Sequence, residues 1–506
     1  MKFLLYINNI IVFLIFIKNI YSSNYFLNNN NNDNNNDNNS DNNNDNNNDN
    51  NNDNNNDNDN NNDDNNETIK FVFEIMRHGA RSPTKLTDDN KDVLNVEWSD
   101  GPGELTAIGL SQHFLVGLRN RLRYIEKNKL LNETYDPKEI FIISTPVNRT
   151  IMSVNAEIQG MFLPGTGPTI SENQTCNAVP SLKSSEYYKY EIDNLKKDNY
   201  YMSIREKINV LPVYTFIQEN IDSQLVDEQH CKGLKYVYKK RRKTSQYRDF
   251  YKELKKKYGE KLKEFVGEEN FDIDDYKTID KIMDAAISDY KEIRTMDEFN
   301  KNVGDFIDFA ENFAFNFSVL EYIGNDKDND EEIAKIASSK IFVYVLNYMD
   351  NIINNENNKN NDENIFLPKF VLFSMHETNL GPFSYFMELA FKKDFKKYAN
   401  FSANANLELY KKNNDYIVKY LFNDEPLLNV SYKEFKKKIK DLIMTDEEIK
   451  NLCDASSKNY KWLILILSII MIILIITLII IYFVKKNKKF NLSDISNIST
   501  VKLYNS

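Results

Sequence analysis

One uncharged apolar stretch, from Trp462 to Val484, constrains this chain more than any other feature. It holds 23 residues rich in Ile and Leu, and a helix of that length measures about 34 Å, enough to cross a hydrocarbon core of about 30 Å. A helix in a soluble core is seldom apolar on every face over such a length. Four lysines follow within Lys485–Lys489, and the positive-inside rule places them in the cytosol. We therefore expect a single-pass type I membrane protein, anchored by one helix at 462–484 and ending in a cytoplasmic tail at 485–506.

The amino-terminal part carries a second membrane signal. Lys2 precedes a short apolar run, Ile10–Ile17, which is too short to span a bilayer. Together with the small residues that follow, this run predicts a cleavable signal peptide over 1–23. Residues 24–67 are dominated by Asn and Asp, cannot bury a core, and predict a disordered spacer. The folded body would then lie outside the cytosol, at the cell surface or in a lysosome-like lumen; the sequence leaves that choice open.

The charge and the cysteine and histidine content exclude several functional classes. The net charge is −11, but ten aspartates lie in the Asn/Asp tract, so the body is nearly neutral and no nucleic-acid partner is expected. The chain has four histidines and three cysteines, and none of them form a cluster with metal-ligand spacing. We therefore expect neither a metal nor another cofactor.

Strands and helices alternate in two separate parts of the body. The first part covers 68–185 and the second 331–456, and each combines short apolar strands with amphipathic helices. Between them, 186–330 is rich in Lys, Tyr and Glu at helical spacing, and we expect no strong strand there. This pattern predicts an α/β fold, a three-layer α/β/α core interrupted by an inserted α-helical cap.

Three of the expected strands end in motifs that carry chemistry. The strand Phe71–Met76 is followed by Arg77, His78 and Arg81, the strand Glu139–Ser144 by Arg149, and the strand Phe370–Ser374 by His376 and Glu377. In open α/β sheets, ligand sites form beyond the carboxyl ends of the strands. We therefore expect these six side chains to meet in one crevice.

Such a set of side chains suits the chemistry of phosphate esters. Guanidinium groups present forked donors that match phosphate oxygens. Nearby positive charges disfavour the imidazolium form, so His78 would be neutral and nucleophilic. The carboxyl of Glu377, protonated in acid, would donate its proton to a departing alkoxide.

The motifs that carry these residues also resemble a known family. "RHGARSP" with a later "HE" resembles the histidine acid phosphatases, which share the phosphoglycerate-mutase-like fold. The segments "GELTAIGLSQHFLVGLRNRLRY" and "STPVNRTIMSVNAEIQGMFLP" are similar to the next two blocks of that family. R-H-G alone is a weak signal, but R-H-G-x-R-x-P followed by two blocks in order is a strong one. The likeness extends over roughly Ile69 to Asp454.

The resemblance implies a role for each of the six residues. His78 would attack phosphorus and form a phosphohistidine; Arg77, Arg81 and Arg149 would hold the phosphoryl oxygens; His376 would add a donor; and Glu377 would protonate the leaving group. Most of these phosphatases carry aspartate where this chain has Glu377. The extra methylene puts the preferred leaving group and the rate in question, more than the type of reaction.

Other residues are expected to have structural roles. The resemblance pairs Cys231 with Cys453 in a disulfide and leaves Cys176 unpaired. His113 and His230 are interpreted as structural. The basic run at 239–243 is interpreted as a solvated helix face rather than a site for polyanions. Asn-x-Ser/Thr sequons, each a weak signal for glycosylation in a secretory protein, occur at Asn66, Asn132, Asn173, Asn316, Asn400 and Asn429.

The resemblance implies an acid phosphatase that hydrolyses small phosphate monoesters without a metal. Two alternatives stay open. One is a narrower enzyme, either a phytase-like inositol polyphosphate phosphatase or a phosphotransferase. The other is a surface adhesion or receptor protein in which the site has little turnover. The sequence also leaves open whether the protein is a monomer or a homodimer.

Overall fold

The computed structural model describes residues 67–84, 101–178, 194–197, 200–216, 231–266, 284–285, 287–288, 331–357, 367–395 and 399–500. The expected signal peptide, nearly all of the expected spacer, His230 and much of the expected cap therefore lie outside the described residues.

A seven-stranded sheet with the strand order β10-β9-β8-β1-β7-β2-β6 forms the centre of the fold. Its parallel part consists of β1 (Glu67–Arg77), β7 (Phe370–Met375), β2 (Ile140–Ser144) and β6 (Tyr214–Thr215). Its antiparallel part consists of β8 (Asn404–Lys412), β9 (Asp415–Phe422) and β10 (Glu425–Ser431). The register pairs Arg77 with Met375 and Ser144 with Ser374. The carboxyl ends of β1, β7 and β2, which carry the predicted motifs, therefore lie side by side at the same end of the sheet.

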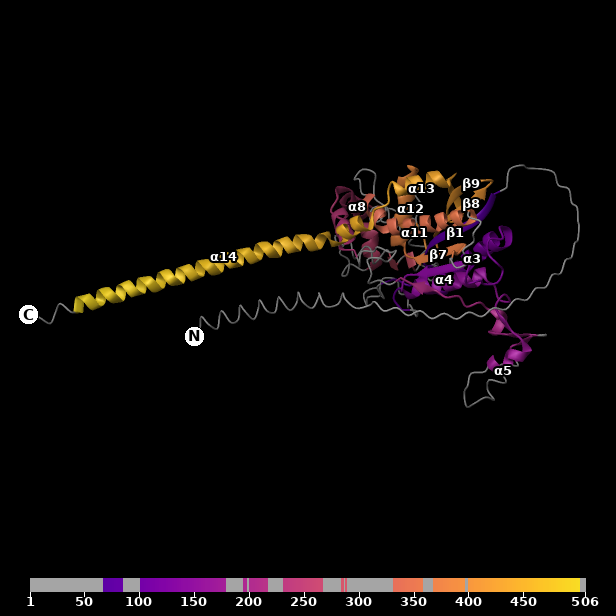
Figure 1. Cartoon of the computed structure of the whole chain (residues 1–506), viewed down its shortest axis with the longest axis horizontal. Coiled ribbons are helices and arrows are strands. Elements are labelled where there is room, and N and C mark those ends of the chain that lie inside the picture. Colours follow the sequence, from indigo (N-terminus) through magenta and orange to yellow (C-terminus); the bar gives the residue numbers. More distant parts are fainter. Residues whose placement is uncertain are drawn as a thin grey trace, which may run out of the picture. The chain divides into compact units, whose positions relative to one another are not determined.

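Helices cover both faces of this sheet because β1 is apolar on both of its faces. Phe71, Phe73 and Ile75 belong to one buried cluster, and Val72 and Met76 belong to another. The first cluster includes residues of α11 (Glu331–Asn357), α12 (Glu377–Phe391) and α13 (Tyr432–Lys440). The second includes residues of η1 (Arg121–Lys127), which continues α3 (Ala107–Asn120), and of α4 (Asn148–Met161). Figure 1 shows α3 and α4 on one side of β1 and β7, and α11 and α12 on the other. The predicted three-layer α/β/α core is confirmed.

The expected cap region is less uniformly helical than its composition suggests. It contains α7 (Lys232–Arg241) and α8 (Ser245–Val266), as expected. However, β4 (Lys196–Lys197) and β5 (Tyr200–Met202) form a small antiparallel sheet with β3 (Thr169–Ile170), and β6 joins the central sheet beside β2. No strong strand was expected in 186–330, and the strands described there have only two or three residues, which is too short to show alternation in the sequence. Short elements in the same part of the fold are η2 (Glu172–Gln174), α5 (Thr175–Ala178) and η3 (Arg205–Lys207).

A disulfide joins Cys231, the N-cap residue of α7, to Cys453 in α14 (Asp446–Thr500). This is the pairing that the family resemblance implies, and its two Cα atoms lie 4.4 Å apart. The side chain of Cys176 lies outside the described residues. In the basic run at 239–243, the lysines are exposed but Arg241 is buried. The expectation of a solvated helix face is therefore met by the lysines and not by Arg241.

The middle part of α14 matches the expected membrane anchor. Its segment Leu465–Lys486 is the one helix among the described residues that is long and apolar enough to cross a bilayer. Nearly all of its side chains are exposed, which is the surface that a lipid environment would cover. The expected span, 462–484, overlaps this segment almost completely.

Candidate active site

The loop after β1 is held closely by the two helices beneath it. A Cβ atom on Gly79 would lie 2.5 Å from the carbonyl oxygen of Gly109 in α3, so only glycine fits at this position. The amide of Gly79 donates a hydrogen bond to Oγ of Ser153 in α4 (3.0 Å), and the next amide donates to Oε1 of Gln112 in α3 (2.9 Å). The two helices therefore fix the loop that presents His78.

His78 is buried, with 3% of its surface exposed. Its Nδ1 lies 2.9 Å from the carbonyl oxygen of Gly79. A carbonyl can only accept, so Nδ1 carries the proton and the lone pair of the neutral ring lies on Nε2. Burial, followed by the charges of Arg77 and Arg81, holds the pKa of His78 well below its usual value. Nε2 therefore remains available as a nucleophile in acidic solution.

Arg77 and Phe401 form one wall of the site. Arg77 Nη1 lies 3.1 Å from Oε2 of Glu377 and also donates to the carbonyl of Ala399. The guanidinium lies over the Phe401 ring, 4.4 Å from its centroid, and the His78 ring is 5.8 Å from the same ring. Phe401 was not predicted as a site residue, and here its ring supports Arg77 through a cation–π contact.

The other two strand ends bring Arg149 and His376 together. Arg149 Nη2 lies 3.4 Å from Nδ1 of His376, and Nε2 of His376 lies 3.0 Å from Oγ1 of Thr145. Burial and the neighbouring arginines lower the pKa of His376 to about 3, and burial with Arg81 lowers the pKa of Arg149 to about 10. His376 is therefore a neutral donor or acceptor throughout the working range of an acid hydrolase.

These elements together make a site for an anion. The Nε atoms of Arg81 and Arg149 are buried and have no hydrogen-bond partner among the described residues. Helices α4 and α12 both begin here, with Arg149 in the first turn of one and Glu377 as the first residue of the other. Helix N-termini attract negative charge. The rings of His78 and His376 are only 5.5 Å apart at the centre of the site, and the other four predicted side chains lie around them. The structure therefore brings all six predicted side chains together.

Asp284 is a further residue at this site that the sequence did not point to. Its Oδ1 lies 2.8 Å from Nη2 of Arg81, and its Oδ2 accepts from the amide and the hydroxyl of Thr84, both at 2.9 Å. Asp284 follows Arg81 by more than two hundred positions, inside a segment of ordinary helical composition. No local motif marks it.

A buried polar network lies below the site and supports it. His113 Nε2 lies 3.1 Å from the carbonyl oxygen of Arg77, and its Nδ1 lies 3.2 Å from Glu157. Asn120 joins the carboxyls of Glu157 and Glu74, with both distances 2.8 Å. The structural interpretation of His113 is confirmed. Glu74 is the single acid in the apolar run Phe71–Met76, and it is the sequence feature that could have indicated this network.

This network is held mostly uncharged. Burial lowers the pKa of His113 to about 4 and raises the pKa of Glu157 to about 7. Nε2 of a neutral His113 must donate to the Arg77 carbonyl, so Nδ1 has to accept. Only a protonated Glu157 can supply the proton for that bond. The network therefore fixes the backbone at Arg77 while Glu157 remains protonated.

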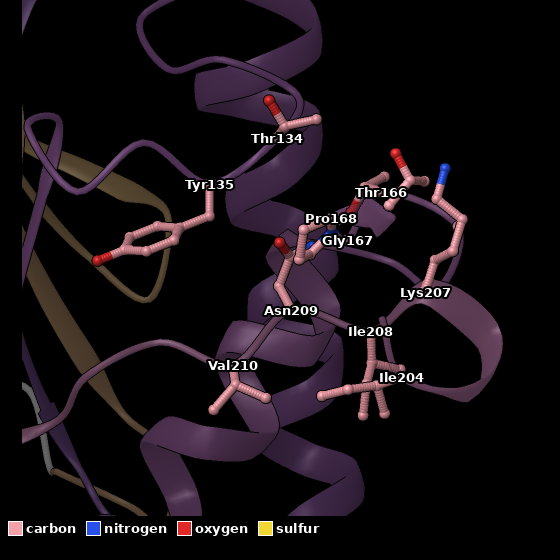
Figure 2. Close-up of a pocket in the computed structure, with 12 residues that line it drawn as sticks. Thr134, Tyr135, Thr166, Gly167, Pro168, Ile204, Lys207, Ile208, Asn209 and Val210 are labelled. Atoms are coloured by element: carbon pink, nitrogen blue, oxygen red, sulfur yellow. Dashed lines mark hydrogen bonds between the residues drawn. The ribbon is translucent and has the colours of Figure 1, made fainter. Parts of the chain in front are cut away.

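A separate cavity of ≈ 620 Å³ lies at the far end of α4 from Arg149. Figure 2 shows its lining, with Tyr135 on one side and Ile204 and Lys207 on the other. None of the six predicted residues contributes to it. Among the described residues, no three His, Cys, Asp or Glu side chains form a group that would hold a metal ion.

Comparisons with known proteins identify the family of this chain. The profile of the histidine phosphatase superfamily (branch 2) matches residues 68–423. Lysosomal acid phosphatase of Xenopus laevis is 26% identical over 363 residues, which cover 71% of this chain and 70% of that protein. Human prostatic acid phosphatase is 41% identical over 98 residues, which cover 19% of this chain and 24% of that protein. A phytase from Citrobacter braakii superposes with a TM-score of 0.47 at 13% identity, over 75% of this chain and 98% of that one. Because the profile matches well over half of the chain, from β1 to the end of β9, the protein belongs to the histidine phosphatase superfamily, branch 2.

Proposed function

We propose that this histidine phosphatase is a membrane-anchored acid phosphatase that hydrolyses small phosphate monoesters through a phosphohistidine at His78. The observation that carries the proposal is the state of His78. Its lone pair is on Nε2, its pKa is held low, and three arginines surround it. A neutral imidazole inside an arginine cradle is suited to attack a bound phosphate.

In the first step, Nε2 of His78 attacks phosphorus, and the P–O bond to the leaving group breaks. Arg77, Arg81 and Arg149 would hold the three phosphoryl oxygens, where their charges stabilise the transition state. Once a phosphate takes the place of the contact with Arg149, Nδ1 of His376 would donate a further hydrogen bond to it, in the tautomer whose Nε2 accepts from the hydroxyl of Thr145.

Glu377 is the proposed proton donor to the leaving oxygen. Its carboxyl is at the start of α12, partly exposed, and 3.1 Å from Arg77. In the second step, the Glu377 carboxylate would accept a proton from water. The oxygen of this water attacks phosphorus as the P–N bond breaks, which releases inorganic phosphate and restores neutral His78.

We further propose that Leu465–Lys486 anchors the protein as a type I membrane protein, with residues 24–456 extracellular or lumenal. The support is the length and composition of this helix and the lysines that follow it. Residues 1–23 would be removed as a signal peptide, and 485–506 would form the cytoplasmic tail.

The test is an activity assay on full-length protein in detergent. With p-nitrophenyl phosphate and a metal chelator, we expect turnover at acidic pH that declines toward neutrality, and we expect none in His78→Ala. Folded wild-type protein without turnover would refute the proposal and favour a binding or adhesion role. Turnover of inositol hexakisphosphate far above that of p-nitrophenyl phosphate would favour a phytase-like enzyme.

A further inference from the structure

Asp284 makes a set of contacts at the rim of the phosphate site. Its two carboxylate oxygens accept from both terminal nitrogens of Arg81, at 2.8 and 3.3 Å. The backbone amide and the hydroxyl of Thr84 add two further hydrogen bonds, both of 2.9 Å. The Asp284 side chain is 25% exposed, so part of it remains accessible to solvent beside Arg81.

These contacts leave one edge of Arg81 available to a phosphate. Nη1 and Nη2 of Arg81 bond Asp284, and Nη1 also donates to the carbonyl of Ser82. Nε is buried and has no partner among the described residues. A phosphoryl oxygen can therefore bind at Nε while Asp284 stays on the opposite edge, so substrate binding does not require Asp284 to leave.

Asp284 keeps its charge in acid. Burial raises its pKa, but the charge of Arg81 and the hydrogen bonds from Arg81 and Thr84 outweigh burial, and the pKa of Asp284 lies below its usual value. The charge of Asp284 also acts on Arg149. It raises the pKa of Arg149, against the lowering caused by burial and Arg81. An acid phosphatase of this structure therefore works with a fixed negative charge beside its phosphate site.

We propose that Asp284 is a specificity-determining residue that disfavours substrates carrying additional phosphate groups. It would favour monoesters whose alcohol part is neutral or cationic. This inference rests on the proposed phosphatase function. The physical reason is that only one phosphate of a polyphosphorylated substrate can occupy the arginine cradle, and its other phosphates would lie toward the opening, where Asp284 repels them.

The test compares three substrates in full-length protein in detergent: p-nitrophenyl phosphate, phosphoethanolamine and inositol hexakisphosphate. In Asp284→Asn, kcat/KM for inositol hexakisphosphate relative to p-nitrophenyl phosphate should rise by about tenfold or more, the size that one unit charge produces across a partly screened crevice. The same ratio for phosphoethanolamine should fall. Asp284→Glu keeps the charge and should keep wild-type ratios. Asp415→Asn, the same change at the exposed first residue of β9, is the matched control and should alter nothing.

Three results would overturn the inference. Unchanged kcat/KM values for all three substrates in Asp284→Asn would show that this charge does not select substrates. An equal loss with all three substrates would mean that Asp284 only positions Arg81. An equal gain would mean that Asp284 competes with every phosphate for Arg81. Wild-type protein that turns over none of the three would instead refute the phosphatase function, and this inference with it.

Discussion

Replacement of Glu377 by glutamine tests the acid–base part of the mechanism. Glutamine has nearly the same shape and keeps an oxygen for Arg77, whose Nη1 is 3.1 Å from the Glu377 carboxyl. It has no acidic proton to give. Glu377→Gln should therefore impair only reactions whose leaving group needs protonation.

The structure sets the expected size of each effect. Because glutamine still accepts a hydrogen bond from Arg77, the loss is the difference between a charged and a neutral hydrogen bond, about 1 kcal/mol, so KM should change by no more than about fivefold. General acid catalysis contributes about 10²- to 10⁴-fold, and this factor should disappear from kcat for an alkyl phosphate such as glycerol 2-phosphate. For p-nitrophenyl phosphate, whose phenolate leaves readily, kcat should fall less than about tenfold.

The assay measures steady-state kinetics on both substrates for wild type, Glu377→Gln and Glu377→Asp. The aspartate variant restores a proton donor one methylene shorter, so it should recover part of the activity on the alkyl substrate. If Glu377→Gln slowed both substrates by the same factor, Glu377 would bind or position phosphate. The proton donor would then have to be another group.

The remaining predictions concern stability and the site loop. Glu157, with its pKa raised to about 7, binds more protons folded than unfolded between about pH 4.5 and 7. The contribution of Glu157 to the free energy of unfolding should therefore fall by about 3 kcal/mol as pH rises through this window, and the difference in stability between wild type and Glu157→Gln, which still donates to His113, should change with pH by that amount in urea unfolding. Replacing Cys231 and Cys453 by serine opens a loop with a sequence separation of 222 and should lower the free energy of unfolding by about 5 kcal/mol; an equally stable variant would contradict this. Gly79→Ala forces a contact of 2.5 Å with α3 and should cut kcat more than about a hundredfold with native circular dichroism, whereas near-wild-type turnover would refute the proposed fit.

Much of the site could be predicted because its residues lie in short motifs at strand ends. Arg77, His78 and Arg81 occur within five positions, and apolar strands precede each of the three motifs. The register of β1, β7 and β2 then places the motifs side by side. The hydrophobic pattern of the sequence also predicted the three layers of the fold, because β1 is buried on both faces.

The rest depends on contacts between distant parts of the chain. Asp284 meets Arg81 across 203 positions, and nothing in its neighbours distinguishes it from other helical acids. Phe401 becomes part of the site only because β8 pairs with β1. Strand β6 is too short to show a pattern, and its partner β2 lies far away in sequence. Contacts of this kind follow from the tertiary fold, which composition and periodicity do not specify.

The most direct test of the central claim is to trap the covalent intermediate on His78. Full-length protein is mixed with ³²P-labelled substrate, quenched in denaturing alkali within one turnover, and digested for peptide mapping. We predict label on the peptide that contains His78, stable in alkali and lost in mild acid, as expected for a phosphoramidate, and no label in His78→Ala. Label that survives acid, as phosphoserine does, or that an acid quench traps but alkali removes, as from an acyl phosphate, would contradict the account. So would an active enzyme that leaves no label on any residue.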